Sequence, residues 1–397
     1  MDDLKFGIGD ALGTDYFFLK EQMTPRQLDY LRRTREFVDH AVLPVINGYW
    51  ERAEFPWPLV EQLAKLGIVG DGIVGYGCPP MDPLSAGLVH MELSRGDGSL
   101  GTFAGVQAGL AMQAIAQCGS EEQKQRWLPP MARLDKIGAF ALTEPDHGSD
   151  SVALQTTARR DGGSYLLDGA KKWIGNGTIA DIIVVWARDT SDGKVKGFLV
   201  EQGTPGYQAR VIEGKASLRA MWQAEIALQG VRVPAENRLP GANSFADCAA
   251  VLVGTRSGCA WMALGHAVAG FDAALAYAKR RIQFGKTLTS FQIVQQRLVH
   301  MLAEVTAMQL YCMQIARLAE AGRLAPTLAG LAKLHNTTKA RGVLAEARDL
   351  LGGNGILLDF HAIRHMADIE AVHTFEGTET IQTLIVGRDI TGIGAFA

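Results

Sequence analysis

Signatures of disulfide frameworks, zinc sites and nucleic-acid binding are missing from this 397-residue sequence. Its five cysteines are odd in number, widely spread and form no CxxC pair: Cys78, Cys118, Cys248, Cys259 and Cys312. They predict free thiols in a reducing compartment. The 39 basic and 42 acidic residues give a net charge of −3, which argues against a protein built to coat nucleic acid or an anionic membrane.

Targeting and membrane-spanning patterns are also lacking. The N-terminal residues Met1 to Lys5 are not a basic region followed by an apolar run, so no secretory signal is expected. The C-terminal residues Gly394 to Ala397 are not a peroxisomal address. No uninterrupted apolar stretch is long enough to span a bilayer. We therefore expect a cytoplasmic protein whose partners are small molecules or proteins.

The chain is long and rich in apolar residues. With 47% hydrophobic residues, a chain of this length can bury more than one large core. Residues 24 to about 133 have a helical pattern, in which Thr24-Pro25 is an N-cap followed by proline and Ser120 to Gln123 is a capping box. These signals predict an N-terminal helical domain over residues 1–136.

The next zone changes to the period of two that is typical of strands. Its β-rich runs include Ser164–Leu167, Ile182–Ala187 and Gly197–Glu201. Short strands joined by tight turns, without long helices between them, indicate an antiparallel barrel or sandwich. We predict a middle antiparallel β-barrel domain over residues 137–243.

Long helices are predicted again in the last part of the chain, at roughly 244–281, 289–321, 325–352 and 359–393. They form a C-terminal four-helix bundle domain over residues 244–397, and the whole chain is an α+β multidomain protein. The four helices are more apolar than the interior of one bundle requires, so another subunit should cover part of their surface.

Two common motifs carry no function in this context. Gly70 to Gly75 satisfies GxGxxG, but Tyr76 to Pro80 follows where a dinucleotide-binding loop would open a helix, so we interpret it as a loop. His361 and His365 have the spacing of neighbours on a helix face, but no glutamate follows His361 and no third ligand is evident. A solvated or satisfied pair is favoured over a metal site.

Phe375-Glu376-Gly377-Thr378 is the most informative part of the sequence. A lone glutamate in a Gly-Thr turn is normally solvated. Far upstream, however, are the segments Leu142–Asp150, Lys172–Asn176 and Arg281–Gly285. In this order the segments resemble the flavin-dependent acyl-CoA dehydrogenases, and the resemblance runs from about residue 24 to the end.

An FAD site is the first implication of the resemblance. The Phe140 to Thr143 backbone, Leu142 included, and the Thr143 hydroxyl would bond the pyrimidine edge of the flavin, with Gly148 and Ser149 at the pyrophosphate. Reduction places negative charge on that edge, which fixed donors stabilise. Without the resemblance, the same residues indicate a strand that ends at a proline turn.

Trp173 and Gly175 follow in the second segment. Trp173 alone could be a core aromatic residue, whereas the resemblance places it against the flavin ring. The family usually has threonine at the position of Gly175, and the threonine hydroxyl reaches flavin N5. Its loss removes one donor and is expected to leave a void that could admit dioxygen.

Further FAD contacts are implied for the C-terminal zone. They are Arg281, Phe284, Gln292, Gly352, Gly353 and Thr378. Arg281 would pair with the pyrophosphate of an FAD held mainly by a neighbouring subunit, since a guanidinium binds phosphate in bidentate fashion. By pattern alone, Arg281 is a cation at a helix C-terminus and Gly352 a C-cap glycine at positive φ.

The implied reaction is α,β-dehydrogenation of an acyl-CoA thioester. Glu376 takes the α-proton while the β-hydride moves to flavin N5, and the thioester carbonyl is held by the Glu376 N–H and a ribityl hydroxyl. Burial under substrate should raise the pKa of Glu376. Gly377 permits the turn, and Arg256 is expected close to it.

Within the family, the segments Ile369–Thr378 and Gly387–Ile393 look most like the glutaryl-CoA dehydrogenase branch. That branch binds the distal carboxylate with an arginine, whose place Gly101 occupies here, and Ser94 replaces its acidic partner. A buried carboxylate without a cation is strongly disfavoured. A different set of segments, Glu92–Thr102 together with Trp173–Asn176 and Leu239–Phe245, is similar to plant short-chain acyl-CoA oxidases.

These resemblances leave several functions open. The first is a short-chain acyl-CoA dehydrogenase that passes electrons to an electron-transfer flavoprotein, as a homotetramer. The alternatives are an oxidase that uses dioxygen, a glutaryl-CoA dehydrogenase and, remotely, a non-catalytic flavoprotein scaffold.

Overall fold

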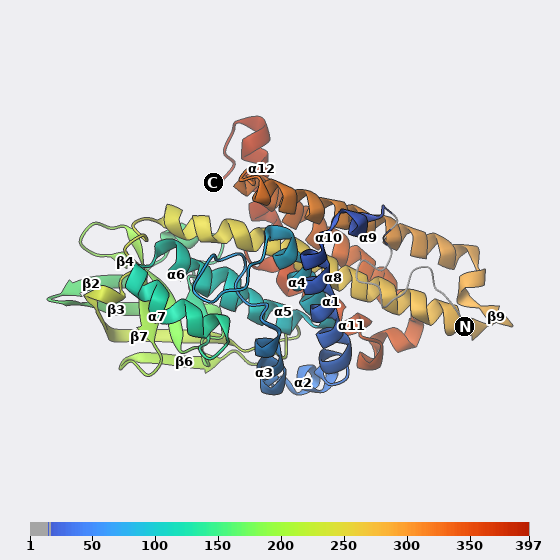
Figure 1. Ribbon diagram of the computed structural model, residues 1–397, viewed down its shortest axis with the longest axis horizontal. Coiled ribbons are helices and arrows are strands. Elements are labelled where there is room, and N and C mark those ends of the chain that lie inside the picture. The colour runs from blue at the N-terminus through green and yellow to red at the C-terminus, as the bar shows by residue number, and fades with distance from the viewer. Residues whose placement is uncertain (1–14, 16, 397) are drawn as a thin grey trace.

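The computed structural model describes residue 15 and residues 17–396. The predictions about Met1 to Lys5 and about Ala397 concern residues outside this part. The molecule is elongated, with a β-sheet at one end of its long axis and long helices extending to the other (Figure 1).

The first part of the chain is helical, as predicted. Its helices are η1 (Leu19–Gln22), α1 (Pro25–Phe37), the π-helix η2 (Val38–Val42), α2 (Ile46–Arg52), α3 (Trp57–Leu66), α4 (Pro83–Gly96), α5 (Gly98–Ala104), the π-helix η3 (Gly105–Met112), α6 (Gln113–Cys118) and α7 (Glu121–Ala132). Capping boxes begin α1 at Thr24 with Gln27 and α7 at Ser120 with Gln123. Both predicted helix starts are confirmed, because capping depends on residues three apart in sequence.

A curled seven-stranded sheet forms the middle of the chain. Its strands are β1 (Gly138–Ala141), β2 (Thr157–Asp161), β3 (Ser164–Gly175), β4 (Ile182–Asp189), β5 (Val195–Glu201), β6 (Tyr207–Val211) and β7 (Gln223–Pro234), with the short helices η4 (Ser151–Ala153) and η5 (Ala235–Asn237) between them. The strand order is β1-β4-β2-β3-β7-β6, and β5 pairs with β4. The predicted β domain is confirmed.

Two strand pairs correct the prediction of a wholly antiparallel sheet. β1 pairs in parallel with β4, from Gly138 opposite Ile182 to Ala141 opposite Val185, and β2 pairs in parallel with the end of β4. The reason is the connection between them. In the sequence, the β2–β3 hairpin follows β1 and precedes β4, and it returns the chain so that β4 runs in the same direction as β1, as a crossover must.

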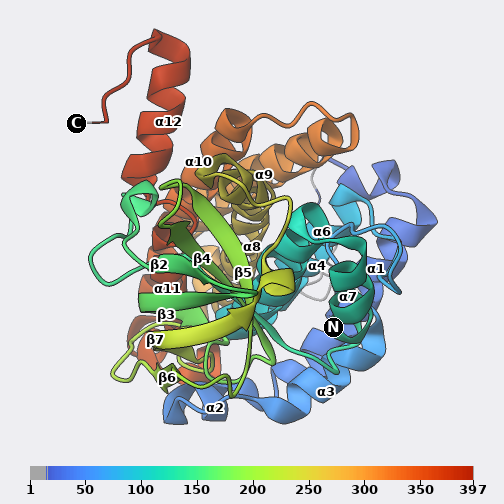
Figure 2. The same ribbon diagram turned by 90° about the vertical axis from the view of Figure 1, so that its left-hand side faces the viewer.

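The last part of the chain contains five α-helices among the described residues. Its elements are α8 (Phe245–Arg280), β8 (Ile282–Gln283), β9 (Lys286–Thr287), η6 (Leu288–Ser290), α9 (Gln292–Glu320), α10 (Pro326–Leu350), η7 (Gly352–Ile356), η8 (Leu358–Phe360), α11 (Ala362–Thr374) and α12 (Glu379–Thr391). The predicted single helix over 359–393 is wrong, because the turn at Phe375–Thr378 divides it. Figure 2 shows α12 standing away from the body.

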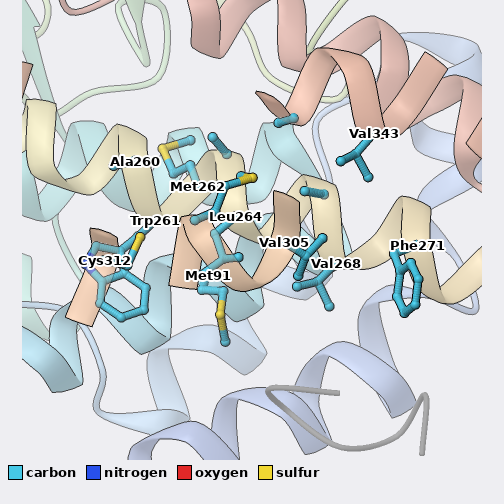
Figure 3. Packing of buried hydrophobic residues seen from close by; sticks show 14 of the residues in the cluster. Met91, Ala260, Trp261, Met262, Leu264, Val268, Phe271, Val305, Cys312 and Val343 are labelled. Carbon is cyan, nitrogen blue, oxygen red and sulfur yellow. The ribbon is translucent and has the colours of Figure 1, made fainter. Parts of the chain in front are cut away.

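α8 is the one described helix that is long and apolar enough, by length and composition, to cross a membrane. However, 78% of its apolar window is buried inside the protein, as in a core helix. Figure 3 shows why: Trp261 and Leu264 of α8 pack with Met91 of α4 and Val305 of α9. Packing is therefore continuous across the predicted domain boundaries.

Candidate active site

The Glu376 turn joins α11 to α12. Glu376 has φ 56° and Gly377 has φ 88°, so both lie in the left-handed region that glycine tolerates and glutamate rarely adopts. A Cβ on Gly377 would overlap with the Gln382 side chain. The expectation that Gly377 permits this turn is confirmed. A glutamate held in this backbone conformation is the kind of strained residue that gathers at functional sites.

Two buried side chains hold the turn in place. Lys333 of α10 is 1% exposed, and its Nζ donates hydrogen bonds to the carbonyl oxygens of Phe375 and Gly377. Gln382 of α12 donates from Nε2 to the Glu376 carbonyl oxygen at 2.9 Å. No sequence pattern points to Lys333 or Gln382, because each reaches the turn through tertiary packing.

The Glu376 carboxylate points into the protein. Thr255 of α8 donates from Oγ1 to Glu376 Oε2 at 2.5 Å. Burial raises the pKa of Glu376, and the hydrogen bond from Thr255 and the charges of Lys333 and Arg256 reduce this effect without reversing it. The structure thus brings Arg256 close to Glu376, and Arg256 Nε is buried without a hydrogen-bond partner in the described part of the chain.

The end of β1 and the middle of β3 form a second wall. Lys172 donates its backbone N–H to the Thr143 carbonyl oxygen at 2.9 Å, so the two predicted segments lie side by side. Trp173 has φ 63° and is 55% exposed. The alternative that Trp173 is a core aromatic is therefore wrong. The side chains of Phe140 and Leu142 are buried, so these two residues can offer only backbone groups to a ligand.

The π-helix η3 connects the two walls. Val106 Cγ2 lies 2.9 Å from the position that a Cβ on Gly175 would take, and Thr255 Cγ2 lies 3.4 Å from the corresponding position at Gly109. One short element therefore contacts both the strand beside Trp173 and the threonine that binds Glu376. π-helices often occur at functional sites.

Three family profiles match successive parts of this chain. They are the N-terminal domain of acyl-CoA dehydrogenase at residues 24–135, its middle domain at 139–231 and its C-terminal domain at 246–391. A short-chain specific acyl-CoA dehydrogenase of Clostridium acetobutylicum is 33% identical over 381 residues, which are 95% of this chain and 99% of the relative. This chain belongs to the acyl-CoA dehydrogenase family.

Solved structures agree with this assignment. A glutaryl-CoA dehydrogenase from Mycobacterium smegmatis, solved in complex with FADH2, has a TM-score of 0.95 and 38% identity, with 97% of this chain and 99% of that chain covered. Butyryl-CoA dehydrogenase from Megasphaera elsdenii has a TM-score of 0.88 and 32% identity, with coverages of 93% and 98%.

Acyl-CoA dehydrogenases are oxidoreductases that act on CH–CH groups and use FAD. The described residues fit this cofactor. Trp173 presents an exposed indole, and Gly148 and Ser149 lie in an exposed loop, where a Cβ on Gly148 would meet nothing within 4 Å. Backbone amides in such open loops can approach a pyrophosphate closely.

A buried ion pair fixes the start of this acyl-CoA dehydrogenase loop. Glu144 Oε1 is 2.9 Å from Lys171 Nζ and also accepts the Thr156 N–H, while Oε2 accepts the Gln155 N–H at 2.6 Å. Lys171 Nζ also donates to the Leu142 carbonyl oxygen at 3.0 Å. Burial raises the pKa of Glu144, but Lys171 and the other donors outweigh it and lower the pKa to about 2. No sequence pattern points to this pair, because Glu144 and Lys171 are 27 positions apart.

The expected void at Gly175 is absent. A Cβ at this position would lie 2.7 Å from Met221 Cε and 2.9 Å from Val106 Cγ2. Two neighbouring side chains therefore fill the space beside Gly175. The prediction failed because residue 221 is far from residue 175 in sequence.

The remaining predicted FAD contacts divide into two groups. Thr378 lies in the Glu376 turn, whereas Arg281, Phe284, Gln292, Gly352 and Gly353 lie elsewhere in the C-terminal part of the chain. Thr378 is the N-cap of α12, where its side chain accepts the Ile381 N–H at 3.3 Å. Arg281 ends α8 in the wall of a surface pocket that also includes Tyr277 and Phe360. Phe284 is 94% exposed on the β8–β9 hairpin, which lies at the opposite end of the molecule from the sheet (Figure 1).

Gln292 and the glycine turn belong to this second group by sequence position. Gln292 opens α9 and is exposed. Gly352 follows α10 with φ 60°, which confirms the C-cap prediction, and Gly353 is exposed beside it. Within one chain, these residues and Arg281 are not brought together with Thr143 and Trp173.

Ser94 and Gly101 face each other inside the protein. The Ser94 hydroxyl occupies the space where a Cβ on Gly101 would lie. The nearest arginine on the same helix is already paired, since Arg95 binds Glu92 at 2.7 Å and Asp39 at 2.5 Å. Arg95 is therefore not free to bind a substrate carboxylate beside Ser94.

The structure agrees with the interpretation of the GxGxxG match and of the two histidines. Gly70 to Gly75 forms a loop that no helix follows directly. His365 pairs through Nδ1 with His266 at 2.8 Å, and His361 pairs with Arg364 at 3.1 Å. All five cysteines are free thiols, as predicted.

Proposed function

We propose that this chain catalyses α,β-dehydrogenation of short-chain acyl-CoA thioesters to 2-enoyl-CoA, with Glu376 as the base. The observation that carries the proposal is the arrangement around η3. The threonine that holds the carboxylate, Thr255, and the strand that exposes Trp173 both lie against the same eight-residue helix. A base and a flavin ring on these two walls would lie on opposite sides of a thioester between them.

Each residue has a defined part in this reaction. A proton α to a thioester is far less acidic than a carboxylic acid, so a base with a raised pKa is better matched to it. Thr255 occupies Glu376 Oε2, which leaves Oε1 to take the proton. Lys333 and Gln382 fix the turn from behind. FAD, when bound along Thr143, Gly148, Ser149 and Trp173, supplies the hydride acceptor.

A short acyl chain without a carboxylate is the proposed substrate. The relatives include a short-chain specific enzyme and a butyryl-CoA dehydrogenase, but also a glutaryl-CoA dehydrogenase. Two residues argue against a substrate with a distal carboxylate. Gly101 stands where the glutaryl-CoA dehydrogenase branch has arginine, and Ser94 fills the space next to Gly101. A buried carboxylate without a cation would be strongly disfavoured.

Electron-transfer flavoprotein is the proposed electron acceptor. One argument for the oxidase alternative was open space next to Gly175, and Met221 and Val106 fill that space. Reduced enzyme should therefore be reoxidised slowly by air. The separation of Arg281 and Phe284 from Trp173 within one chain supports a site shared between subunits, and the family resemblance suggests a homotetramer. A cytoplasmic location stays a proposal, consistent with five free thiols.

Steady-state rates with butyryl-, hexanoyl- and glutaryl-CoA test this function. We expect reduction of an artificial acceptor with butyryl- or hexanoyl-CoA, and a much lower kcat/KM for glutaryl-CoA. A clear preference for glutaryl-CoA would refute the argument from Ser94 and Gly101. Air reoxidation faster than turnover would favour the oxidase instead.

A further inference from the structure

A histidine and an aspartate form a buried pair beside the proposed active site. His90 of α4 is 6% exposed, and its Nε2 is 2.9 Å from Asp71 Oδ2. Asp71 belongs to the Gly70–Gly75 loop, for which the sequence analysis found no function. His90 Nδ1 is buried and has no hydrogen-bond partner in the described part of the chain.

Unfilled space adjoins this histidine on two sides. A Cβ on Gly105 of η3 would meet only His90 Cε1, at 4.0 Å, and a Cβ on Gly258 of α8 would meet only His90 Cδ2, at 3.9 Å. Gly254, one helical turn before Gly258, is exposed, so this side of α8 opens to solvent there. Two glycine-bearing helices therefore leave room between them, and the imidazole forms part of its wall.

The His90–Asp71 pair also lies close to the residue that supports the base. The position of a Cβ on Gly109 is 3.0 Å from Asp71 Oδ2 and 3.4 Å from Thr255 Cγ2, and Thr255 binds Glu376. A chain of short contacts therefore connects the His90–Asp71 pair with the proposed catalytic carboxylate.

Further hydroxyl groups without partners lie along the same helices. Ser94 is one turn after His90 on α4, and Thr102 follows Gly101 on α5. Ser94 Oγ and Thr102 Oγ1 are buried and have no hydrogen-bond partner among the described residues. Buried polar groups are nearly always paired, so several unpaired ones in one region call for a ligand or water.

We infer that His90 is a specificity-determining residue, and that the enzyme accepts short acyl chains bearing a hydroxyl or other neutral oxygen near the end. This inference rests on the proposed function and narrows its substrate class. A carboxylate accepts at His90 Nε2, so Nε2 carries a hydrogen, and the unpartnered Nδ1 is left to donate to or accept from an acyl group beside it. A hydroxyl satisfies either state, whereas a methyl group leaves Nδ1 unpaired.

Charge distinguishes this substrate class from a dicarboxylate. Asp71 compensates His90 when the imidazole is protonated, and with a neutral imidazole the pair carries a negative charge, so in neither state does the pair offer a free positive charge. An additional carboxylate would lie near the Asp71 carboxylate without a cation of its own, which is unfavourable in a buried site. Ligand sites that hydrogen-bond a substrate hydroxyl reject the analogue without it more strongly than apolar pockets reject an extra methylene.

Matched substrates test the inference on the unmodified holoenzyme. 4-Hydroxybutyryl-CoA is compared with pentanoyl-CoA, and 5-hydroxypentanoyl-CoA with hexanoyl-CoA, since in each pair a hydroxyl replaces a methyl of similar size. We expect kcat/KM to favour the hydroxylated member of at least one pair by about tenfold or more. Preference for the alkyl member in both pairs would overturn the inference.

Variants assign the preference to the histidine. His90→Leu should lower the hydroxyl-to-alkyl ratio of kcat/KM by about tenfold or more, and His90→Gln, which keeps a hydrogen-bonding group, should restore part of it. His300→Leu, at an exposed histidine on α9, is the matched control and should leave the ratio unchanged. If His90→Leu lowers kcat/KM by the same factor for the hydroxylated and for the alkyl acyl-CoA of each pair, His90 has a merely structural role and the proposal is contradicted.

The two failures are distinguishable. If no acyl-CoA, hydroxylated or not, reduces the bound flavin, the proposed function itself is wrong. If alkyl acyl-CoAs reduce it efficiently and the hydroxyl compounds do not, the function stands and only the role of His90 falls.

Discussion

At the scale of single residues, the proposed site depends on side chains that hold one carboxylate in a strained turn. Lys333 is 1% exposed, so its ammonium group is removed from water, and it donates hydrogen bonds to two backbone carbonyl oxygens of the turn. Burial lowers the pKa of Lys333. Such an arrangement is costly unless every donor finds an acceptor, so this lysine serves the geometry of the turn.

Lys333→Met should therefore reduce stability and activity together. The Phe375 and Gly377 carbonyl oxygens would lose their buried donor, at about 1–3 kcal/mol, and Glu376 would no longer be fixed. Thermal unfolding and kcat measure the two effects. Lys339→Met on the same helix is the control, because it removes only an exposed ion pair with Glu304, which contributes at most about 1 kcal/mol. Indistinguishable behaviour of the two variants would contradict this role.

Thr255→Val should change the pH dependence. The hydrogen bond from Thr255 stabilises ionised Glu376 and so lowers its pKa. Without that bond the pKa rises further, and because the base must be ionised, the acidic limb of the kcat/KM profile should move to higher pH. Thr306→Val, at a buried threonine that donates to Leu302, is the control. An unmoved limb, or one moved to lower pH, would show that Thr255 does not act on the base.

At the scale of elements, the site is assembled where helix and strand ends meet. The loop after β1 is fixed to β3 by Glu144 and Lys171, and Trp173 follows two residues later. η3 then connects β3 to α8. The local signals of these elements were readable from the sequence: the caps at Thr24 and Ser120 and the glycine of the turn each depend on residues a few positions apart.

The contacts between elements were not readable in the same way. Thr255 and Glu376 are 121 positions apart, and Lys333 reaches the turn from another helix. Nothing in the spacing of such residues distinguishes them from ordinary core positions. The filled space at Gly175 was missed for the same reason, since Met221 approaches it from a distant segment. The family resemblance supplied the identity of the base but not its supports.

Lys171→Met should destabilise the loop that is proposed to bind FAD. The variant leaves the Glu144 carboxylate buried without its cation, a change that typically costs about 3–5 kcal/mol. We expect a lower unfolding temperature and loss of FAD on gel filtration, which absorbance measures directly. Lys136→Met, which removes the exposed pair with Asp181, should retain FAD. Full FAD retention by Lys171→Met would exclude the proposed link between pair and cofactor.

At the scale of the whole molecule, the sheet and the β8–β9 hairpin lie at opposite ends (Figure 1). Arg281 and Phe284 can therefore contribute to the same FAD as Trp173 only if a second copy provides them. The apolar residues exposed near that end, such as Ile282 at 60% and Ile293 at 70%, fit a surface that another subunit covers.

Subunit complementation tests this arrangement. Glu376→Gln and Arg281→Met chains should each be inactive alone. In mixed oligomers from co-expression, about a quarter of the sites should combine Glu376 of one chain with Arg281 of its neighbour, since half the sites carry the base and half their neighbours the arginine. Turnover of butyryl-CoA measures the recovery. No recovered activity would place both residues in the same chain's site.

The most direct test of the account is anaerobic reduction of the bound flavin by butyryl-CoA in the unmodified enzyme and in Glu376→Gln. Glutamine keeps the size of the side chain and its contact with Thr255 but cannot accept the α-proton. We predict rapid bleaching of the flavin absorbance in the unmodified enzyme and a loss of at least about a hundredfold in rate in the variant. Bleaching at an undiminished rate in Glu376→Gln would contradict the assignment of the base.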